Sequence, residues 1–545
     1  MPMWDGTSEN GISAPIGIKG TGNPMELSLG LDPTKVNTLI AGTTGSGKSN
    51  LLHVIIMSFA LKYSPEELIF YLIDFKEAEF SRYTNLPHVE VLGVESDSEY
   101  GLAILTKLVN EKDSRMHKFR EAGVNKISSY RLNHPRDLFP RIMVIFDEYQ
   151  RLLEDERIKS EALMKIEDLA RTVRAAGIHL ILSTQTISPG LLNNATMGQF
   201  RMRIGLRCTS RDDSERIIGN NGAADLGKKT GFAIYTDNPA GGVQYNNEFM
   251  VAMAPSVADY NRYIVMMNDS PKLKNYNKRP RVFRGFEPVK FDDYKELFLI
   301  SDKEDSESIH AWLGEPIKIA SPLAAEFNYR LGDNLAIITD DVRDAYGMIL
   351  SSLLSILTQS KETRIHLLDS GVKPQYSSIL SRIAKEYPDN VFLTNQDALS
   401  DSFRGIADQS SQRPSQDSSM IFVIIVGLQK FLTLRAPEEY LQHSYEDRQS
   451  LNQYLIRILK EGPERGIHTI VWCDTYKAFK LYFPNQGRGI RDYFNFKVAG
   501  TMDYEDSNNF IQDSIAIKKI NRPHRAIYYS NGVYTLFRPF DADYK

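Results

Sequence analysis

Cysteine is nearly absent from this sequence of 545 residues, which contains only Cys208 and Cys473. The two are far apart and lack the close spacing of metal-binding cysteine pairs, so the sequence predicts neither a disulfide framework nor a cysteine-ligated metal. This composition favours a reducing environment, and we predict a cytoplasmic location. Any association with a membrane is then expected to arise through a partner or through a segment outside this sequence.

Long hydrophobic runs and an excess of basic residues are also missing. The longest apolar stretches, such as residues 420–428, are far shorter than the ~20 residues needed to cross a bilayer, and there is no signal-peptide pattern. Lys and Arg number 65 against 69 Asp and Glu, which gives a net charge of −4. The surface as a whole is therefore not expected to bind a polyanion, and contact with nucleic acid would need a local patch or channel.

What the sequence does contain is a phosphate-binding loop. Residues 42–49 read Gly-Thr-Thr-Gly-Ser-Gly-Lys-Ser and fit the pattern G-x-x-x-x-G-K-S. An apolar strand is expected over residues 37–41 and an apolar helix over residues 51–61. The phosphates would then lie at the N-terminus of the helix, where unpaired N–H groups favour an anion. The sequence therefore predicts binding of a nucleoside triphosphate.

Each fixed residue of the loop has an expected role. The glycines Gly42, Gly45 and Gly47 would allow positive φ angles, so that successive N–H groups turn toward the anion. Lys48 would contact the β- and γ-phosphates, and the Ser49 hydroxyl would be a ligand for Mg²⁺. The residues expected to contact the nucleotide are Gly42, Thr43, Thr44, Gly45, Ser46, Gly47, Lys48, Ser49 and Asn50.

Polar side chains follow two further predicted strands. Asp147 and Glu148 end the hydrophobic run 141–146; Asp147 is expected to bind Mg²⁺ and Glu148 to polarise an attacking water. The alternative is that this acidic pair only caps a helix. Gln185 follows residues 180–184 and is expected to sense the γ-phosphate, the alternative being a polar strand end.

The first half alternates buried strands with helices, which predicts a parallel α/β sheet with right-handed crossovers. The second half repeats the pattern: residues 334–338 correspond to 37–41, and Gly466-Ile467-His468 repeats Gly177-Ile178-His179. We therefore predict tandem RecA-like P-loop NTPase domains of the α/β class. The predicted divisions are domain 1 over residues 1–265, a linker over 266–312 and domain 2 over 313–545.

The second domain is predicted to be degenerate. Where the P-loop should lie, residues 339–344 contain no glycine or lysine and place two carboxylates at the phosphate position. Val426-Gly427 stands where Asp147-Glu148 should be. Because a triphosphate would meet repulsion there, we expect domain 2 neither to bind nor to hydrolyse nucleotide in the usual way. Within the linker, the basic run 271–281 could touch a nucleic-acid backbone, or it could simply be solvated.

The first half resembles the motor domain of the FtsK/SpoIIIE family of DNA translocases, in the wider HerA/FtsK group. The resemblance follows the family's order across about residues 15–255. It implies an ATPase that uses ATP and Mg²⁺, forms a homo-oligomeric ring, expected to be a hexamer, and moves double-stranded DNA through a central channel. The stretches that carry it are residues 41–49, 73–79, 86–89, 144–148 and 174–185.

The resemblance also implies that a neighbouring subunit donates an arginine to the phosphates. Arg115 is the expected donor by position, the alternative being an ion pair with Glu111 or Asp113. Loops near 76–82 and after Gln185 would contact the moved polymer, with Lys76 and Arg82 as candidates for phosphate contact or as parts of a solvated loop. The remaining candidates for the donated arginine are Arg171, Arg174 and Arg201.

The tandem arrangement also resembles the EccC/EssC ATPases of type VII protein secretion. Residues 64–72 followed by 86–88 point to that branch, whereas residues 74–76 and 183–185 point to the DNA-moving branch. We expect a DNA translocase whose second domain is a non-catalytic regulatory or docking domain. The alternatives are a protein-secretion ATPase, with a protein partner on domain 2, and a nucleotide-gated assembly scaffold.

Overall fold

The computed structural model divides the chain into two units, Met1–Gly285 and Phe286–Lys545, which we call unit 1 and unit 2. The division falls inside the predicted linker 266–312, yet that segment is not free of regular structure, because parts of it belong to a helix and to both sheets. The described residues are 3–76, 78–135, 137, 139–185, 191–226, 230–240, 242–273, 281–285, 287–294, 308–317, 320–394, 398–414, 419–436, 451–483, 490–520 and 522–543.

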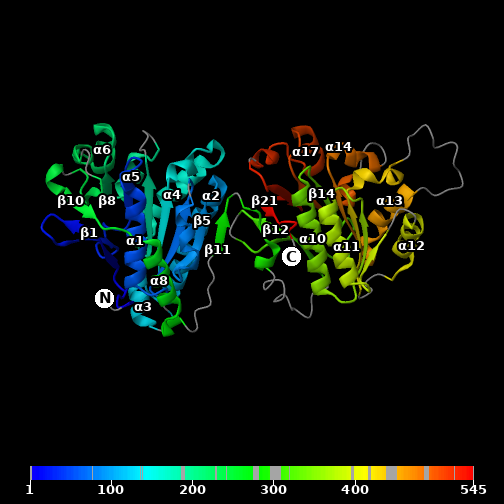
Figure 1. Ribbon diagram of the computed structural model, residues 1–545, viewed down its shortest axis with the longest axis horizontal. Helices are drawn as coiled ribbons and strands as arrows, with labels where there is room; N and C mark the ends of the chain where they lie inside the picture. The colour runs from blue at the N-terminus through cyan, green and yellow to red at the C-terminus, as the bar shows by residue number, and fades with distance from the viewer. Residues whose placement is uncertain are drawn as a thin grey trace. The chain divides into compact units, whose positions relative to one another are not determined.

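Unit 1 is built on one mixed sheet (Figure 1), with the strand order β11-β5-β4-β6-β7-β3-β8-β9-β10-β1-β2 over the described residues. The central strands pair in parallel, and the strands from β8 to β2 pair antiparallel. The strands are β1 (Ile12–Lys19), β2 (Pro24–Leu29), β3 (Thr38–Ala41), β4 (Leu68–Asp74), β5 (Val89–Val94), β6 (Arg141–Asp147), β7 (Ile178–Thr184), β8 (Met202–Leu206), β9 (Phe232–Thr236), β10 (Asn247–Val251) and β11 (Arg281–Arg284).

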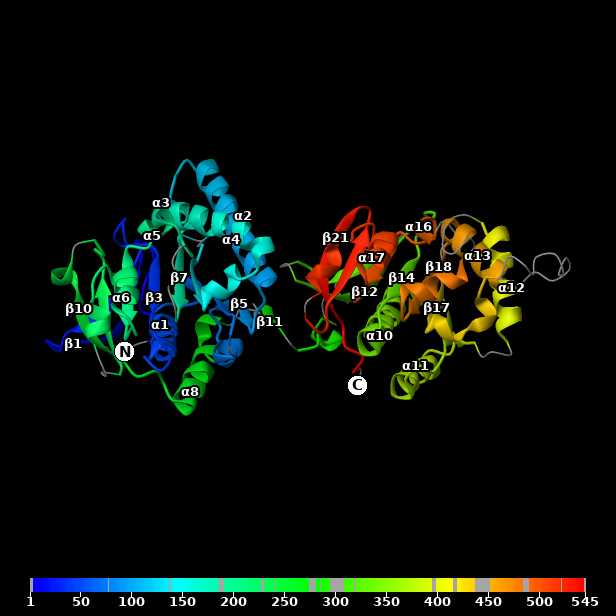
Figure 2. The same cartoon turned by 90° about the horizontal axis from the view of Figure 1, so that it is seen from above.

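Helices cover both faces of this sheet. Strands β4, β6 and β7 are buried along their whole length, which explains why they read as unbroken apolar runs rather than as alternating patterns. In Figure 2, α1 and α8 lie on one side of the strands, and α2, α3 and α4 lie on the other. The helices are α1 (Lys48–Lys62), α2 (Ser98–Glu121), α3 (Ile127–Asn133), α4 (Glu156–Thr172), α5 (Asn194–Gln199), α6 (Arg211–Ile218), α7 (Gly222–Asp225) and α8 (Val257–Asn268).

Unit 2 repeats this sheet strand for strand. Its order is β16-β15-β17-β18-β14-β19-β20-β21-β12-β13, which matches that of unit 1 from β5 to β2. The prediction of tandem α/β domains is therefore confirmed. The strands are β12 (Ile309–Pro316), β13 (Leu323–Phe327), β14 (Leu335–Ile338), β15 (Arg364–Asp369), β16 (Val391–Leu393), β17 (Ile421–Val426), β18 (Ile467–Cys473), β19 (Phe496–Ala499), β20 (Ala526–Ser530) and β21 (Val533–Pro539).

The helices of unit 2 also lie on both sides of its sheet, with α10 and α11 on one side and α12, α13 and α17 on the other (Figure 2). Within the described residues, no helix of either unit combines the length and the apolar character needed to cross a membrane. The helices are α10 (Val342–Gln359), α11 (Pro374–Glu386), α12 (Leu399–Gln412), α13 (Leu451–Glu461), α14 (Tyr476–Phe479), α16 (Ile490–Tyr493) and α17 (Tyr504–Ile511).

A buried asparagine and a buried histidine fix the start of the central strands in both units. In unit 1 the Asn37 side chain accepts a hydrogen bond from the Leu180 N–H at 3.1 Å and donates one to the Ala170 carbonyl at 2.9 Å. His179 Nδ1 donates to the Val36 carbonyl at 3.1 Å. These bonds satisfy backbone groups that burial would otherwise leave without water.

Unit 2 uses the same residue types at the equivalent places. Asn334 accepts from the Thr469 N–H at 2.8 Å and donates to the Tyr493 carbonyl at 2.7 Å. His468 Nδ1 donates to the Asp333 carbonyl at 2.7 Å. The repeated Gly-Ile-His sequence is thus explained by strand anchoring in both units, and not by chemistry at the nucleotide site.

Burial keeps these imidazoles neutral and makes unit 2 sensitive to acid. Desolvation lowers the pKa of His468 to about 4, below the value of about 6.5 expected in the unfolded chain. Between those values only the unfolded chain binds the proton. We therefore predict that the free energy of unfolding of unit 2 falls by about 1.4 kcal/mol per pH unit from this group as the pH drops from 6.5 toward 4.

Urea unfolding followed by tryptophan fluorescence at several pH values measures this slope in a Trp4→Phe background, since the remaining tryptophans, Trp312 and Trp472, both lie in unit 2. His468→Gln should flatten the slope, whereas His117→Gln, at a side chain that is 65% exposed, should leave it unchanged. An equally steep slope in His468→Gln would show that this histidine is not the group that titrates.

Candidate nucleotide site

The predicted P-loop lies between β3 and α1, at the carboxyl ends of the parallel strands of unit 1. Strand β3 pairs with β7 and β8, and β6 pairs with β7. The ends of β6 and β7 therefore bring Asp147, Glu148 and Gln185 to the edge of the sheet that carries the loop. Ligands of open parallel sheets bind at this edge, because loops and helix N-termini converge there.

The loop glycines act in two different ways. Gly45 and Gly47 have φ angles of 74° and 99°, as expected for a loop that curls around an anion. The expectation of a positive φ is wrong for Gly42, which is absent from the positive-φ glycines of the chain. A Cβ atom at Gly42 would lie 2.6 Å from Ser46 Oγ and 2.7 Å from the Leu206 Cβ. Gly42 is therefore needed because the loop packs closely against β8.

Lys48 contacts both carboxylates of the strand end. Its Nζ atom forms an ion pair with Asp147 and lies 3.0 Å from Glu148 Oε1. All three side chains are almost fully buried, with exposed fractions of 3% to 7%. Burial by itself would lower the pKa of Lys48, but the two carboxylates outweigh it and raise the pKa above its usual value. The ammonium group is therefore charged and is held between the P-loop and the end of β6.

Glu148 is positioned by its backbone and by two neighbours. Its φ angle of 53° is in the left-handed region, which is uncommon outside glycine. Gln150 Nε2 donates to Glu148 Oε2 at 2.6 Å, and the Gln185 N–H donates to the same oxygen at 3.2 Å. Burial acts to raise the pKa of Glu148, but Lys48 and these donors prevail and lower it. Glu148 is thus an oriented carboxylate, which a general base requires.

Gln185 also connects this carboxylate to the P-loop. The Thr44 hydroxyl donates to Gln185 Oε1 at 3.0 Å, so one residue contacts both the loop and Glu148. The role of Gln150 was not predicted from the sequence. The only available signal was its position two residues after Glu148, in a short 3-10 helix, η2 (Tyr149–Leu153), whose shape the sequence does not reveal.

The remaining loop residues fit a triphosphate and a magnesium ion. Gly47 precedes α1 without a side-chain cap, so the first-turn N–H groups are available to an anion. Among the described residues, the buried Ser46 hydroxyl has no hydrogen-bond partner. Ser49 and Asp147 offer the oxygen donors that Mg²⁺ prefers. Asn50 differs, because its side chain binds the Ala252 carbonyl at 2.8 Å and the Ala254 N–H at 2.9 Å.

Within one chain, Arg115 does not contact Lys48, Asp147 or Glu148. Its guanidinium is 2% exposed and is bound by the Glu111 carboxylate at 2.7 Å, the Pro140 carbonyl at 2.8 Å and the Ala176 carbonyl at 3.0 Å. The predicted role across a subunit interface would require these bonds to break. The other arginine candidates, Arg171, Arg174 and Arg201, are exposed.

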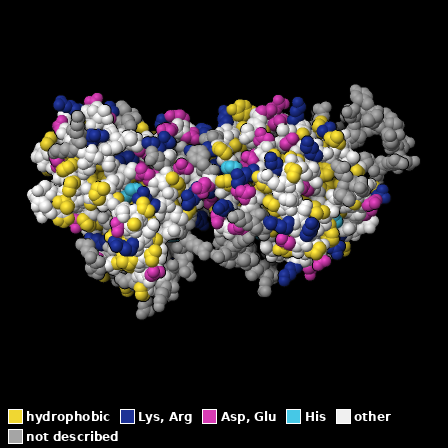
Figure 3. Space-filling view, viewed as in Figure 1, with side chains coloured by type: hydrophobic (Ala, Val, Ile, Leu, Met, Phe, Trp, Pro, Cys, Tyr) yellow, Lys and Arg dark blue, Asp and Glu magenta, His cyan; other side chains and the backbone are white. Residues whose placement is uncertain are grey.

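The loops proposed to contact a polymer are only partly described. Arg82 is exposed, and Lys76 is half-buried with its N–H donating to Asp74 Oδ1 at 2.9 Å. Residues 186–190, which follow Gln185, lie outside the described residues. On the face drawn in Figure 3, Lys and Arg side chains are interspersed with Asp and Glu, and no broad basic field covers that face of either unit.

The equivalent position of unit 2 has the same backbone geometry as the P-loop site but lacks its lysine and its acidic pair. The Thr339 N–H donates to the Cys473 carbonyl at 3.2 Å, as the Gly42 N–H donates to the Thr184 carbonyl at 3.3 Å. Gly427 has a φ angle of 79° and so retains the left-handed geometry of Glu148. A Cβ atom there would lie 2.2 Å from the Ser370 Oγ atom, so neighbouring atoms occupy the place of a side chain.

Comparison with known proteins gives a family match within unit 1. Residues 1–189 match the FtsK/SpoIIIE family. The ESX secretion system protein YukB of Bacillus subtilis is 30% identical over 226 residues, which cover 40% of this chain and 15% of YukB. The DNA translocase FtsK of Streptococcus agalactiae is 32% identical over 240 residues, which cover 41% of this chain and 28% of FtsK. The chain thus aligns with less than a third of either relative.

Solved structures match the chain over its whole length. The cytoplasmic domain of the type VII secretion ATPase EccC of Thermomonospora curvata has a TM-score of 0.67 at 20% identity, covering 100% of this chain and 65% of that one. ATPases 2 and 3 of EssC from Geobacillus thermodenitrificans have a TM-score of 0.60 at 16% identity, covering 99% of both chains. At such identities the likeness concerns the fold, which is that of two tandem ATPase domains.

Replacement of Arg115 separates a structural role from a catalytic one. Arg115→Ala would leave the buried carbonyls of Pro140 and Ala176 without their donor, so we predict a loss of about 2–4 kcal/mol in the stability of unit 1. Arg171→Ala, on an exposed side chain, should change stability by less than about 0.5 kcal/mol. Thermal unfolding of both variants measures this. Normal stability of Arg115→Ala combined with lost ATP turnover would instead support donation to a neighbouring subunit.

Proposed function

We propose that unit 1 hydrolyses ATP with Mg²⁺ and that unit 2 engages a polypeptide without hydrolysing nucleotide. The match of residues 1–189 to the FtsK/SpoIIIE family supports the assignment of unit 1. The observation that carries the proposal is the buried cluster of Lys48, Asp147 and Glu148, for which unit 2 has no counterpart. The chain would act as a homo-oligomeric ring, with hexamers as the expected form.

The geometry suggests how the residues of unit 1 act in turn. Loop N–H groups and the first turn of α1 bind the phosphates, and Lys48 exchanges its carboxylate partners for phosphate oxygens. Ser49 and Asp147 would hold Mg²⁺, which neutralises phosphate charge when bound. Glu148, released from Lys48 but still held by Gln150 and Gln185, orients the attacking water and accepts its proton.

The tandem architecture favours a polypeptide over DNA as the partner. The structural similarity to EccC and EssC extends across both units. The sequence alignments do not separate the two candidates, since those with YukB and with FtsK cover 40% and 41% of this chain. ATPases 2 and 3 of Thermomonospora curvata EccC, which cover 99% of this chain at a TM-score of 0.56 and 16% identity, were solved in complex with a signal sequence peptide. By analogy, unit 2 is proposed as the docking unit for such a segment.

Movement of double-stranded DNA is the second candidate, and it rests on the 32% identity to FtsK in unit 1. The net charge of −4 and the mixed charges in Figure 3 give it little support from the surface as a whole. DNA would then have to contact a channel formed in the oligomer, with Lys76 and Arg82 as the candidate contacts.

Two substitutions test the nucleotide site. Lys48→Ala should abolish ATP binding, because the ammonium that contacts the phosphates is lost. Glu148→Gln should preserve binding and reduce turnover by about 10²–10⁴-fold, because only the base is removed. Asp401→Asn, on an exposed carboxylate of unit 2, serves as the control. Isothermal titration and phosphate release measure the two steps, and normal turnover in Lys48→Ala would refute the assignment.

The nature of the partner is tested by stimulation of ATP turnover. Under the proposal, C-terminal peptides of exported proteins should bind the chain and raise turnover, whereas duplex DNA at low salt should not. Stimulation by DNA that declines steeply with added salt would favour the translocase instead. Oligomers that assemble with ATP but show no sustained turnover would favour the scaffold alternative, and would leave the nucleotide site itself intact.

A further inference from the structure

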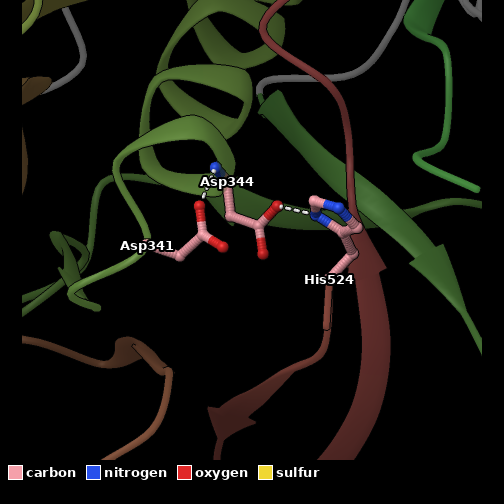
Figure 4. A group of neighbouring side chains, drawn as sticks. All are labelled: Asp341, Asp344 and His524. Atoms are coloured by element: carbon pink, nitrogen blue, oxygen red, sulfur yellow. Dashed lines mark hydrogen bonds and ion pairs between the residues drawn. The ribbon is translucent and has the colours of Figure 1, made fainter. Parts of the chain in front are cut away.

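A group of metal-ligating side chains lies in unit 2 at the position that corresponds to the phosphate site of unit 1. Asp341 is the N-cap of α10, Asp344 lies in the first turn of that helix, and His524 precedes β20 (Figure 4). Strand β14 leads into α10 as β3 leads into α1, since each strand occupies the same place in its sheet. The group is thus placed by the fold where unit 1 is expected to hold an anion.

The three side chains converge on a small volume. Asp344 Oδ1 accepts a hydrogen bond from His524 Nδ1 at 2.6 Å, and one ligand atom from each residue lies within 4.8 Å of the other two. Asp341 Oδ1 accepts the N–H groups of Arg343 and Asp344, both at 3.0 Å. Figure 4 shows the remaining carboxylate oxygens of Asp341 and Asp344 turned toward each other. Capping of α10 therefore uses Asp341 Oδ1 and leaves the second oxygen of Asp341 available.

The charges of this group do not balance. The guanidinium of Arg343, two residues after Asp341, is bound by Asp541 at 2.7 Å and by Asp543 at 3.0 Å. Within the described part of the chain, no lysine or arginine forms an ion pair with Asp341 or Asp344, and Asp344 is only 6% exposed. Two carboxylates therefore share at most the single positive charge of His524, in surroundings that water screens poorly.

We propose that Asp341, Asp344 and His524 bind a divalent transition-metal ion. One imidazole nitrogen and two carboxylate oxygens with a position left open suit Zn²⁺, Co²⁺ or Mn²⁺, whereas Mg²⁺ and Ca²⁺ prefer oxygen ligands alone. On binding, His524 gives up its hydrogen bond to Asp344 and ligates as the neutral imidazole, so a proton is released to solvent. The ion would join the start of α10 to the segment that leads into β20.

The proposal does not depend on the function of unit 1. Where unit 1 has a glycine-rich loop and a lysine for an anion, unit 2 has carboxylates and a histidine for a cation. A metal here would stabilise the folded unit 2 in proportion to its binding, because the ligands come from segments far apart in the sequence. The site would be structural and would have no need of nucleotide.

Metal binding is tested on the full chain carrying Asp147→Asn, which removes the expected magnesium ligand of unit 1. After treatment with a chelator, Co²⁺ and Zn²⁺ are titrated by calorimetry and by the visible absorption of Co²⁺. We expect one ion per chain, a raised unfolding temperature and at least a tenfold weaker affinity in both Asp344→Asn and His524→Gln. His366→Gln, at a histidine of β15 outside the group, should bind as the parent does.

Equal affinity in the parent, Asp344→Asn and His524→Gln would overturn the proposal, as would the absence of binding by either ion. Because Asp344 is buried and its variant could fold poorly, His524→Gln provides the deciding measurement; its side chain is 17% exposed. Circular dichroism of that variant confirms the fold, and ATP turnover in the same variant without Asp147→Asn should remain at the wild-type level.

Discussion

The ion pairing of one buried ammonium with two carboxylates is the interaction on which unit 1 depends. Lys48 comes from the start of α1, and Asp147 and Glu148 come from the end of β6, so the pairing joins loop, helix and sheet. Taking these charges out of water is costly, and each is stable in place only because the others are present. When phosphate binds, Lys48 would exchange its carboxylate partners for phosphate oxygens. The charge that stabilises the empty site would therefore also stabilise the bound nucleotide.

Unit 2 shows which features belong to the scaffold and which belong to the chemistry. The strand order, the anchoring asparagine and histidine and the left-handed turn after the central strand are all repeated. The lysine, the glycine-rich loop and the acidic pair are not. Backbone geometry is thus shared where it supports packing, whereas unit 2 has carboxylates and a histidine where unit 1 has the residues expected to bind its ligand.

Much of this could be predicted from the sequence, because the signals are local. The P-loop, the acidic pair after an apolar strand and the duplicated strand pattern each occupy a short stretch. What was missed depends on contacts between distant residues: the packing of Gly42 against Leu206, the bond from Gln150 to Glu148 and the carbonyl partners of Arg115. The sequence also favoured DNA, because residues 74–76 and 183–185 resemble the DNA-moving branch, although the tandem arrangement already resembled the EccC/EssC ATPases. Such local segments do not decide between the two branches, whereas the fold of both units together matches solved EccC and EssC structures.

The glycine that replaces the acidic residue in unit 2 has one more consequence. Its backbone still adopts the angle that Glu148 needs, but Ser370 Oγ would lie 2.2 Å and Val372 Cγ2 2.9 Å from any new Cβ atom. A side chain at position 427 would therefore require Ser370 and Val372 to move, so unit 2 does not keep open the space that Glu148 occupies in unit 1. At this position the two units thus differ in side-chain packing as well as in chemistry, because the same backbone angle leads to a carboxylate in unit 1 and to a filled space in unit 2.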